Sequence, residues 1–328
     1  MNVFVQGMRR SGTTILYDAL LEDPALRCFY EPFREEKVTE GGGSGAHEGD
    51  VFAETRELRH RFRAERHPDL EPDEFNWGGP REPRLEVGGE LPEHCRGFLA
   101  HLLEQGDEVA IKFTRVYDKL EALAAADPTA ALVHVVRDPR AVTASIMLGR
   151  GRRRAERFPS AGDFFAERSK RMLWSSRGIS QELMRQPRYA AIRRPTDVER
   201  ILLVWRHTFE STRRDGRRLF GDRYLLLRNE DLRADPSAAL ASVYGRLGRG
   251  VPDQVSGWAS ENVRGAEEPY VADDPGWGRA FARVEMRDAL EAAGYPALAA
   301  VVPDSGAAER IGGTARRARR RLGAIVGR

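Results

Sequence analysis

The sequence predicts an α/β fold in three layers, with a central parallel sheet and helices on both faces. Two observations predict it. Short apolar runs at residues 3–6, 108–113, 131–136 and 223–228 alternate with stretches of helical periodicity. The first run leads directly into the glycine-bounded segment GMRRSGTT at residues 7–14, and a helical apolar pattern follows it. That order predicts a strand, an anion-binding loop and a helix.

The loop at residues 7–14 has the spacing of a P-loop, so the fold is expected to be P-loop-like. Backbone N–H groups and the positive end of the helix dipole converge there, which favours a bound phosphate or sulfate. Thr13 stands where a nucleotide kinase or GTPase needs a lysine. In phosphoryl transfer that lysine and magnesium together neutralise a polyphosphate. A sulfuryl group carries less charge, and a loop with an earlier cation can bind it without a metal.

A second candidate anion site follows the apolar, β-branched run at 131–136, which predicts a buried parallel strand. Arg137 stands at the end of this strand, and Ser145 lies eight residues later, about two turns into a predicted helix. Both side chains can therefore reach one anion over the carboxyl edge of the strand. The alternative is that Arg137 only caps the sheet and pairs with Asp138.

These two motifs resemble those of the sulfotransferases, which use 3′-phosphoadenosine 5′-phosphosulfate as donor. The resemblance implies that RRSGTT at 9–14 binds the 5′-phosphosulfate and that Arg137 and Ser145 bind the 3′-phosphate. Residues 225–236 are similar to the family's strand that ends in a "YEDL…DP" turn, with Asn229 in place of the usual tyrosine. The implied donor-binding residues are Arg9, Arg10, Ser11, Gly12, Thr13, Thr14, Arg137, Ser145 and, in a late loop over the nucleotide, Arg264 and Gly265.

The candidate base is Glu31, in the segment FYEP at 29–32, beside the loop at a strand end. Carbohydrate sulfotransferases have a similar Glu-Pro pair, and in tyrosylprotein sulfotransferases a glutamate 21 residues after the loop arginine is the base. Arg10 and Glu31 have this spacing. The alternative is a surface glutamate in a turn. In cytosolic small-molecule sulfotransferases the base is a histidine at a position that is Thr114 here, so that mechanism does not carry over.

Two cations are candidates for stabilising the transferred group. The resemblance places Arg10 where the family contacts the bridging oxygen. Lys112 ends a predicted strand and is one of only four lysines among 53 basic residues, which favours a role for a point charge over a surface position. Ile15 replaces the tryptophan that stacks on the adenine in small-molecule sulfotransferases. Trp205 and Arg206 resemble a later helix of the family, although a tryptophan on a helix face usually belongs to the core.

Composition limits the remaining possibilities. The 328 residues carry a net charge of +3, and no run of 18 apolar residues occurs. The first strand begins too near Met1 to leave room for a signal peptide, so we expect a cytoplasmic protein. Cys28 and Cys95 provide neither a disulfide framework nor a metal cluster, and no metal site is expected. From Glu309 onward there are seven arginines and one acid, which gives the tail +6 and the remainder −3.

We expect one sulfotransferase domain over residues 1–300, with loop-rich insertions at about 34–105 and 150–195, and a basic tail at 301–328. The insertions are expected to build the acceptor side, as a covering lid or as disordered surface. A helix is predicted at about 197–214. The tail is either solvated or in weak contact with a membrane surface, and no nucleic-acid partner is indicated.

The predicted activity is transfer of a sulfuryl group to a hydroxyl of a carbohydrate, natural product or peptide. An amine acceptor fits less well. The alternatives are a P-loop nucleotide or small-molecule kinase, and a nucleotide-binding scaffold without turnover. The sequence does not indicate the acceptor.

Overall fold

The computed structural model describes the chain except for residues 34–52, 72–82, 150–157, 169–175, 266–272 and 304–328. Its centre is a five-stranded sheet with the order β2-β3-β1-β4-β5, and every pairing is parallel. This confirms the predicted fold class. The strands are β1 (Val3–Gln6), β2 (Arg27–Tyr30), β3 (Val109–Phe113), β4 (Ala131–Val136) and β5 (Tyr224–Arg228).

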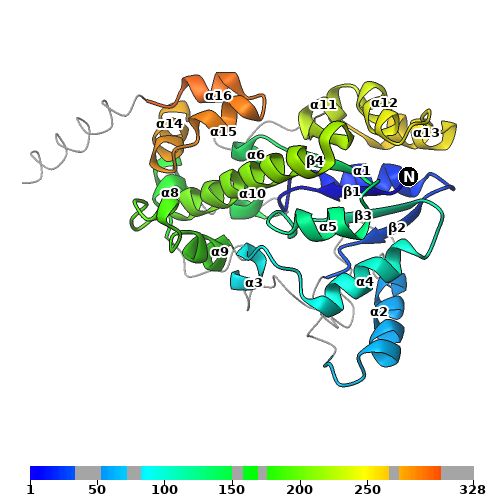
Figure 1. The fold of residues 1–328 in the computed structure, drawn as a ribbon. Coiled ribbons are helices and arrows are strands. Elements are labelled where there is room, and N and C mark those ends of the chain that lie inside the picture. The colour runs from blue at the N-terminus through cyan, green and yellow to red at the C-terminus, as the bar shows by residue number, and fades with distance from the viewer. Residues whose placement is uncertain (34–52, 72–82, 150–157, 169–175, 266–272, 304–328) are drawn as a thin grey trace, which may run out of the picture.

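Helices cover both faces of the sheet (Figure 1). One face packs on α1 (Thr13–Leu21), α12 (Pro236–Arg246) and α13 (Asp253–Asn262) through a cluster that includes Val5, Leu16 and Val243. The other packs on α4 (Glu93–Leu103), α5 (Leu120–Ala126) and the end of α10 (Asp197–Phe220). Burial of such apolar side chains contributes about 1.5–3 kcal/mol each, which fixes the sheet between its helices.

A third apolar cluster lies around α10 beyond the carboxyl edge of the sheet. It joins α10 to α6 (Pro139–Leu148), α8 (Ala161–Ala166), α9 (Ser176–Leu183) and α14 (Asp274–Arg283). Because parallel strands end at one edge, this cluster supports the loops in which the candidate residues lie. The remaining elements are α2 (Ala53–Arg66), α3 (Pro83–Val87), η2 (Pro187–Tyr189), η3 (Gly221–Arg223), α11 (Asn229–Ala234), α15 (Arg287–Ala292) and α16 (Pro296–Ala300).

The insertion at 34–105 differs from expectation. We predicted mainly loop, but its described part contains α2, α3 and α4. Leu58 and Phe62 of α2 pack on Phe98 and Leu99 of α4, so a short apolar stripe holds the strongly polar helix α2 against the more apolar helix α4. The described part of the second insertion contains the helices α8 and α9, and α10 confirms the helix expected at 197–214.

The basic tail lies outside the described residues from residue 304 onward. Among the helices of the described ranges, none has the length and apolarity that crossing a membrane requires.

Candidate active site

The predicted anion loop joins β1 to α1, and its backbone is tightly constrained. Gly12 has φ of 93° and Arg10 has φ of 72°, both in the left-handed region. A Cβ on Gly7 would lie 2.4 Å from the carbonyl oxygen of Val135, so the loop passes directly against β4. Among the described residues, no side chain caps the N-terminus of α1 at Gly12. The first N–H groups of this helix are therefore left to bind a ligand.

The two predicted anion sites meet at Arg10. Its Nε donates a hydrogen bond to Oγ of Ser145 on α6 at 2.7 Å. Nη1 of Arg137, at the end of β4, donates to the carbonyl oxygen of Arg10 at 3.4 Å. Asp138 caps α6 and forms an ion pair with Arg140 at 2.9 Å, so its carboxylate serves Arg140 rather than Arg137. The structure thus brings three implied donor-binding residues together.

The candidate base and the candidate lysine form a direct ion pair. Nζ of Lys112 donates to Oε1 of Glu31 at 2.7 Å, and the two side chains are only 3% and 10% exposed. Lys112 is the second-to-last residue of β3 and lies opposite Tyr30 of β2, and Glu31 follows Tyr30 with φ of 46°. Nζ of Lys112 lies 4.0 Å from the centre of the Tyr30 ring, whose hydroxyl is 3.1 Å from Oγ1 of Thr14. The pair therefore lies beside the start of α1.

Electrostatics keep Glu31 ionised. Burial alone would raise its pKa, but the charge and hydrogen bond of Lys112, with smaller contributions from Thr114 and Arg115, lower the pKa below its ordinary value. Asp18, on α1 near Lys112, behaves oppositely: burial raises its pKa to about 7, against the effect of Lys112. Glu31 is therefore a weak base, which can accept a proton from a hydroxyl group only while the oxygen of that group forms a new bond.

Arg9 differs from Arg10 in its surroundings. Its guanidinium is 8% exposed and forms an ion pair with the fully buried Glu86 of α3 at 2.5 Å. Because this side chain is bound to Glu86, Arg9 can contact the donor nucleotide only through its backbone N–H. Sequence analysis did not identify Glu86, because nothing in its polar segment distinguishes it from other glutamates.

Asn229, Arg233 and the late loop adjoin the anion loop. A Cβ on Gly12 would lie 1.9 Å from Nδ2 of Asn229, so only glycine fits there. Nε of Arg233 donates to Oδ1 of Asn229 at 3.1 Å, and its Nη1 donates to the carbonyl oxygen of Arg264 at 2.6 Å. Arg233 therefore ties the predicted Arg264-Gly265 loop to the anion loop. In the sequence, its spacing of four residues from Asn229 is the feature that could have indicated this contact.

Two buried polar atoms beside the loop have no hydrogen-bond partner in the described structure: Oγ of Ser11 and Nδ2 of Asn229. Unpaired buried polar groups are uncommon and destabilising. Together with the guanidinium groups of Arg10 and Arg137 and the uncapped helix, they fit a site for a polar anion. The donor nucleotide that the sequence resemblance implies is such a ligand.

Two other residues, His134 and Trp205, are buried where α10 packs on the sheet. His134 lies in β4 on the face that packs on α10, and its Nδ1 is 2.9 Å from the hydroxyl of Tyr224. Burial lowers its pKa to about 3, so it is neutral. Trp205 of α10 belongs to the core, stacked on Phe209, and its Nε1 donates to the carbonyl oxygen of Arg137 at 2.9 Å. Trp205 therefore holds the backbone of Arg137, the residue that the resemblance implies for binding the 3′-phosphate.

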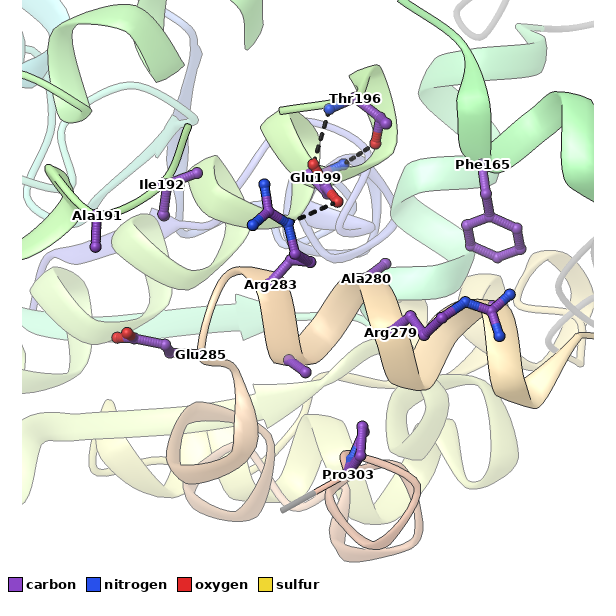
Figure 2. Close-up of a pocket in the computed structure, with 12 residues that line it drawn as sticks. Phe165, Ala191, Ile192, Thr196, Glu199, Arg279, Ala280, Arg283, Glu285 and Pro303 are labelled. Atoms are coloured by element: carbon purple, nitrogen blue, oxygen red, sulfur yellow. Dashed lines mark hydrogen bonds and ion pairs between the residues drawn. The ribbon is translucent and has the colours of Figure 1, made fainter. Parts of the chain in front are cut away.

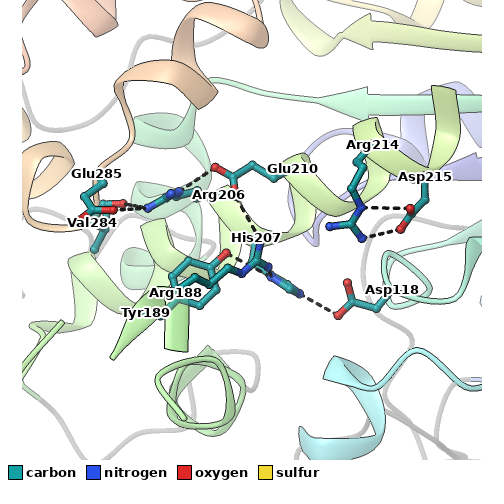
Figure 3. Close-up of polar contacts among 10 residues, drawn as sticks. All are labelled: Asp118, Arg188, Tyr189, Arg206, His207, Glu210, Arg214, Asp215, Val284 and Glu285. Atoms are coloured by element: carbon teal, nitrogen blue, oxygen red, sulfur yellow. Dashed lines mark hydrogen bonds and ion pairs between the residues drawn. The ribbon is translucent and has the colours of Figure 1, made fainter. Parts of the chain in front are cut away.

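Polar contacts hold α10 in this position (Figure 3). Nε2 of His207 lies 2.7 Å from Oδ2 of Asp118, and its Nδ1 faces Arg188. Arg206 binds Glu210 at 2.8 Å and the carbonyl oxygen of Val284. The helix is thus fixed on one side to the loop after β3 and on the other to the end of α14.

A cavity of about 540 Å³ lies between α14 and the start of α10 (Figure 2). Thr196, Glu199 and Arg283 line it, with the aromatic ring of Phe165. None of the candidate donor-binding or catalytic residues lines it. In the described ranges, no three His, Cys, Asp or Glu side chains are grouped as metal binding requires.

Comparisons with solved structures found several bacterial sulfotransferases. The sulfotransferase domain of the Synechococcus PCC 7002 olefin synthase is 19% identical over 83% of this chain and 78% of that one, with a TM-score of 0.40. Sulfotransferase STF9 from Mycobacterium avium is 15% identical over 83% and 70%, with a TM-score of 0.46. The sulfotransferase domain of the curacin biosynthetic pathway is 15% identical over 83% and 78%, with a TM-score of 0.42.

No curated protein matched the sequence. The family comparison is more informative, because the sequence profile of the sulfotransferase family matches residues 2–184, which is more than half of the 328 residues. That range contains the anion loop, Glu31, Lys112, Arg137 and Ser145. The chain belongs to the sulfotransferase family, whose members are transferases that use 3′-phosphoadenosine 5′-phosphosulfate.

Proposed function

We propose that this enzyme transfers a sulfuryl group from 3′-phosphoadenosine 5′-phosphosulfate to a hydroxyl of a carbohydrate, natural product or peptide, without a metal. One observation carries the proposal. The Glu31–Lys112 ion pair lies beside the start of α1, at the same sheet edge where Arg10, Arg137 and Ser145 converge. A proton acceptor, cations and an anion loop are the groups that sulfuryl transfer needs.

The donor's two anionic ends have separate partners in this proposal. The loop residues Arg10, Ser11, Gly12, Thr13 and Thr14 hold the 5′-phosphosulfate, through backbone N–H groups and hydroxyls at the start of α1. Arg137 and Ser145 hold the 3′-phosphate, and the Arg264-Gly265 loop lies over the nucleotide. Because Arg10 binds Ser145 directly, we infer that it contacts both ends of the donor when the donor is bound.

Glu31 is the proposed base. The acceptor oxygen attacks the sulfur, the bond from sulfur to the bridging oxygen of the donor breaks, and the acceptor proton passes to Glu31. Adenosine 3′,5′-bisphosphate leaves with the electron pair of the broken bond. The lowered pKa of Glu31 requires the proton to move as the new bond forms, since the carboxylate is too weak a base to ionise a free alcohol.

Lys112 has two proposed roles. In the described structure it neutralises Glu31, which keeps a buried carboxylate ionised. During transfer its ammonium group stabilises negative charge on the transferred group and the leaving phosphate. Any movement of Lys112 away from Glu31 raises the pKa of the carboxylate and makes it a stronger base.

Incubation of the protein with donor labelled in the sulfuryl group, across a library of hydroxyl and amine acceptors, tests the proposal. We expect the label to appear in the product of an acceptor that carries a hydroxyl group, and to do so in buffer in which a chelator removes metal ions. Binding of the donor with no transfer to any acceptor would favour the scaffold alternative. Strict dependence on magnesium and transfer from ATP would favour a kinase.

A further inference from the structure

Glu86 is fully buried although α3, which carries it, has only five residues. Its Oε2 accepts a hydrogen bond from Nη2 of Arg9 at 2.5 Å, and its Oε1 accepts one from the hydroxyl of Tyr117 at 3.1 Å. Arg9 follows β1, and Tyr117 follows β3. The carboxylate of Glu86 therefore connects the segments that follow the carboxyl ends of the neighbouring strands β1 and β3.

Lys119 fixes the backbone of the same segment. Its Nζ donates to the carbonyl oxygen of Glu86 at 3.0 Å and also to that of Gly88. Lys119 is fully buried, and this burial lowers its pKa to about 8, against the charges of Asp118 and Glu86. Both the side chain and the main chain of Glu86 are thus held at the carboxyl edge of the sheet.

The Glu86 contact acts on the anion loop through Arg9. Arg9 and Arg10 are adjacent but bind different partners: Arg9 binds Glu86, and Arg10 binds Ser145. Between them the chain turns into the left-handed region at Arg10, which is unfavourable for a residue other than glycine. Surrounding contacts must hold that turn, and the buried ion pair of Arg9 is a charge-assisted contact at the residue directly before it.

The residues around Glu86 also contact the helix that supports the second anion site. The ring of Tyr117 packs edge-on against His207 of α10, with ring centres 5.5 Å apart. Trp205, on the same helix, binds the carbonyl oxygen of Arg137. A change at Glu86 can therefore reach the 3′-phosphate site by two routes, through the contacts of Arg10 with Ser145 and Arg137 and through α10.

We propose that Glu86 is a positioning residue for donor binding, which acts through Arg9 to fix the turn at Arg10. The segment between β2 and β3 that carries α3 then sets the affinity for the donor. This inference rests on the proposed function, because it concerns the same loop. It adds a residue that contacts neither the donor nor the acceptor.

Calorimetric titration with adenosine 3′,5′-bisphosphate tests the inference in the full-length protein. Glu86→Gln keeps the shape of the side chain but removes the charge that fixes Arg9. We expect affinity to fall by roughly tenfold to a hundredfold, the size of effect expected when one charge-assisted hydrogen bond to the donor is lost. The control Glu90→Gln changes an exposed glutamate just after α3 and should leave affinity unchanged.

The double variant distinguishes positioning from general damage. If Glu86 acts through Arg9, Arg9→Met combined with Glu86→Gln loses no more affinity than Arg9→Met alone. If Glu86→Gln does not fold, Tyr117→Phe replaces it, since it removes one hydrogen bond to the carboxylate and should weaken binding several-fold.

Two results would overturn the inference. One is that the losses in Arg9→Met and Glu86→Gln multiply in the double variant, and the other is that Glu86→Gln, or its substitute Tyr117→Phe, binds as tightly as the wild type. In either case, binding by the wild-type protein would still support the proposed function. Failure of the wild-type protein to bind would overturn both.

Discussion

Replacing Glu31 by glutamine separates its two roles, proton acceptor and counterion of Lys112. Glutamine keeps the size of the side chain and can still accept a hydrogen bond from Nζ of Lys112, which lies 2.7 Å from Oε1 in the native pair. It cannot take up a proton. We expect turnover to fall by ~10²–10⁴-fold, the contribution typical of a general base, and donor affinity to stay near that of the wild type.

The substitution also has a cost in stability that can be worked from the burial of the pair. Lys112 is 3% exposed, so its charge would be buried with a neutral partner. Breaking such a pair from one side costs about 3–5 kcal/mol, and the remaining hydrogen bond places Glu31→Gln near the lower figure. The double variant Glu31→Gln/Lys112→Met removes both charges. Its free energy of unfolding should therefore be close to that of the wild type.

Single-turnover measurements with labelled donor, once an acceptor is known, decide between these effects. Recovery of stability in the double variant shows that the stability loss of Glu31→Gln comes from the unpaired charge of Lys112. A fall in the turnover of Glu31→Gln at unchanged donor affinity then supports Glu31 as the base. Because the pKa of Glu31 is lowered, the wild-type rate should show no acid limb until the pH falls below about 4.5. Turnover of Glu31→Gln near that of the wild type would refute the reasoning, and Asp18, with its pKa raised to about 7, would become the nearest candidate.

Three further predictions concern other parts of the site and the core. Arg137→Ala and Ser145→Ala should each weaken adenosine 3′,5′-bisphosphate by about tenfold or more but AMP far less, by calorimetry; equal losses for both ligands would make these residues structural. Gly12→Ala should abolish donor binding, because its Cβ would meet Asn229 and its φ is 93°; normal affinity would contradict the loop geometry. The pKa of His134 is about 3 when folded and near 6.5 when unfolded, so stability should fall as the pH drops through this window. Urea unfolding of His134→Asn should show a slope with pH that is shallower by up to ~1.4 kcal/mol per pH unit, and an unchanged slope would place the titration elsewhere.

The sequence was sufficient for the sheet and the anion loop, because both depend on local patterns. Short apolar runs predicted four strands of the sheet, and the glycine spacing predicted the loop between β1 and α1. The pairing of Glu31 with Lys112 was not predicted, although both residues were identified separately. It depends on the register of β2 against β3, which sequence spacing does not determine.

Residues that act through distant contacts were missed. Glu86 is 77 residues from Arg9 and lies in a polar segment that we expected to be loop. Its burial arises from packing of α3 on the rest of the domain, and no local periodicity in five residues could signal it. Helix α2 was missed for a related reason, since its apolar stripe is short and is surrounded by charged residues. Helix α4 was missed although Cys95, Phe98, Leu99 and Leu102 are buried at helical spacing, because the turn-rich stretch before it was interpreted as one long loop.

Binding of adenosine 3′,5′-bisphosphate in the presence of a chelator is the most direct test of the central claim, that the two anion sites at this sheet edge hold the two ends of the donor. The claim predicts affinity at least about tenfold higher than for AMP or ATP, since each charge-assisted contact to the added 3′-phosphate contributes roughly 1.5–3 kcal/mol. Equal affinity for AMP, or binding that requires magnesium, would contradict it.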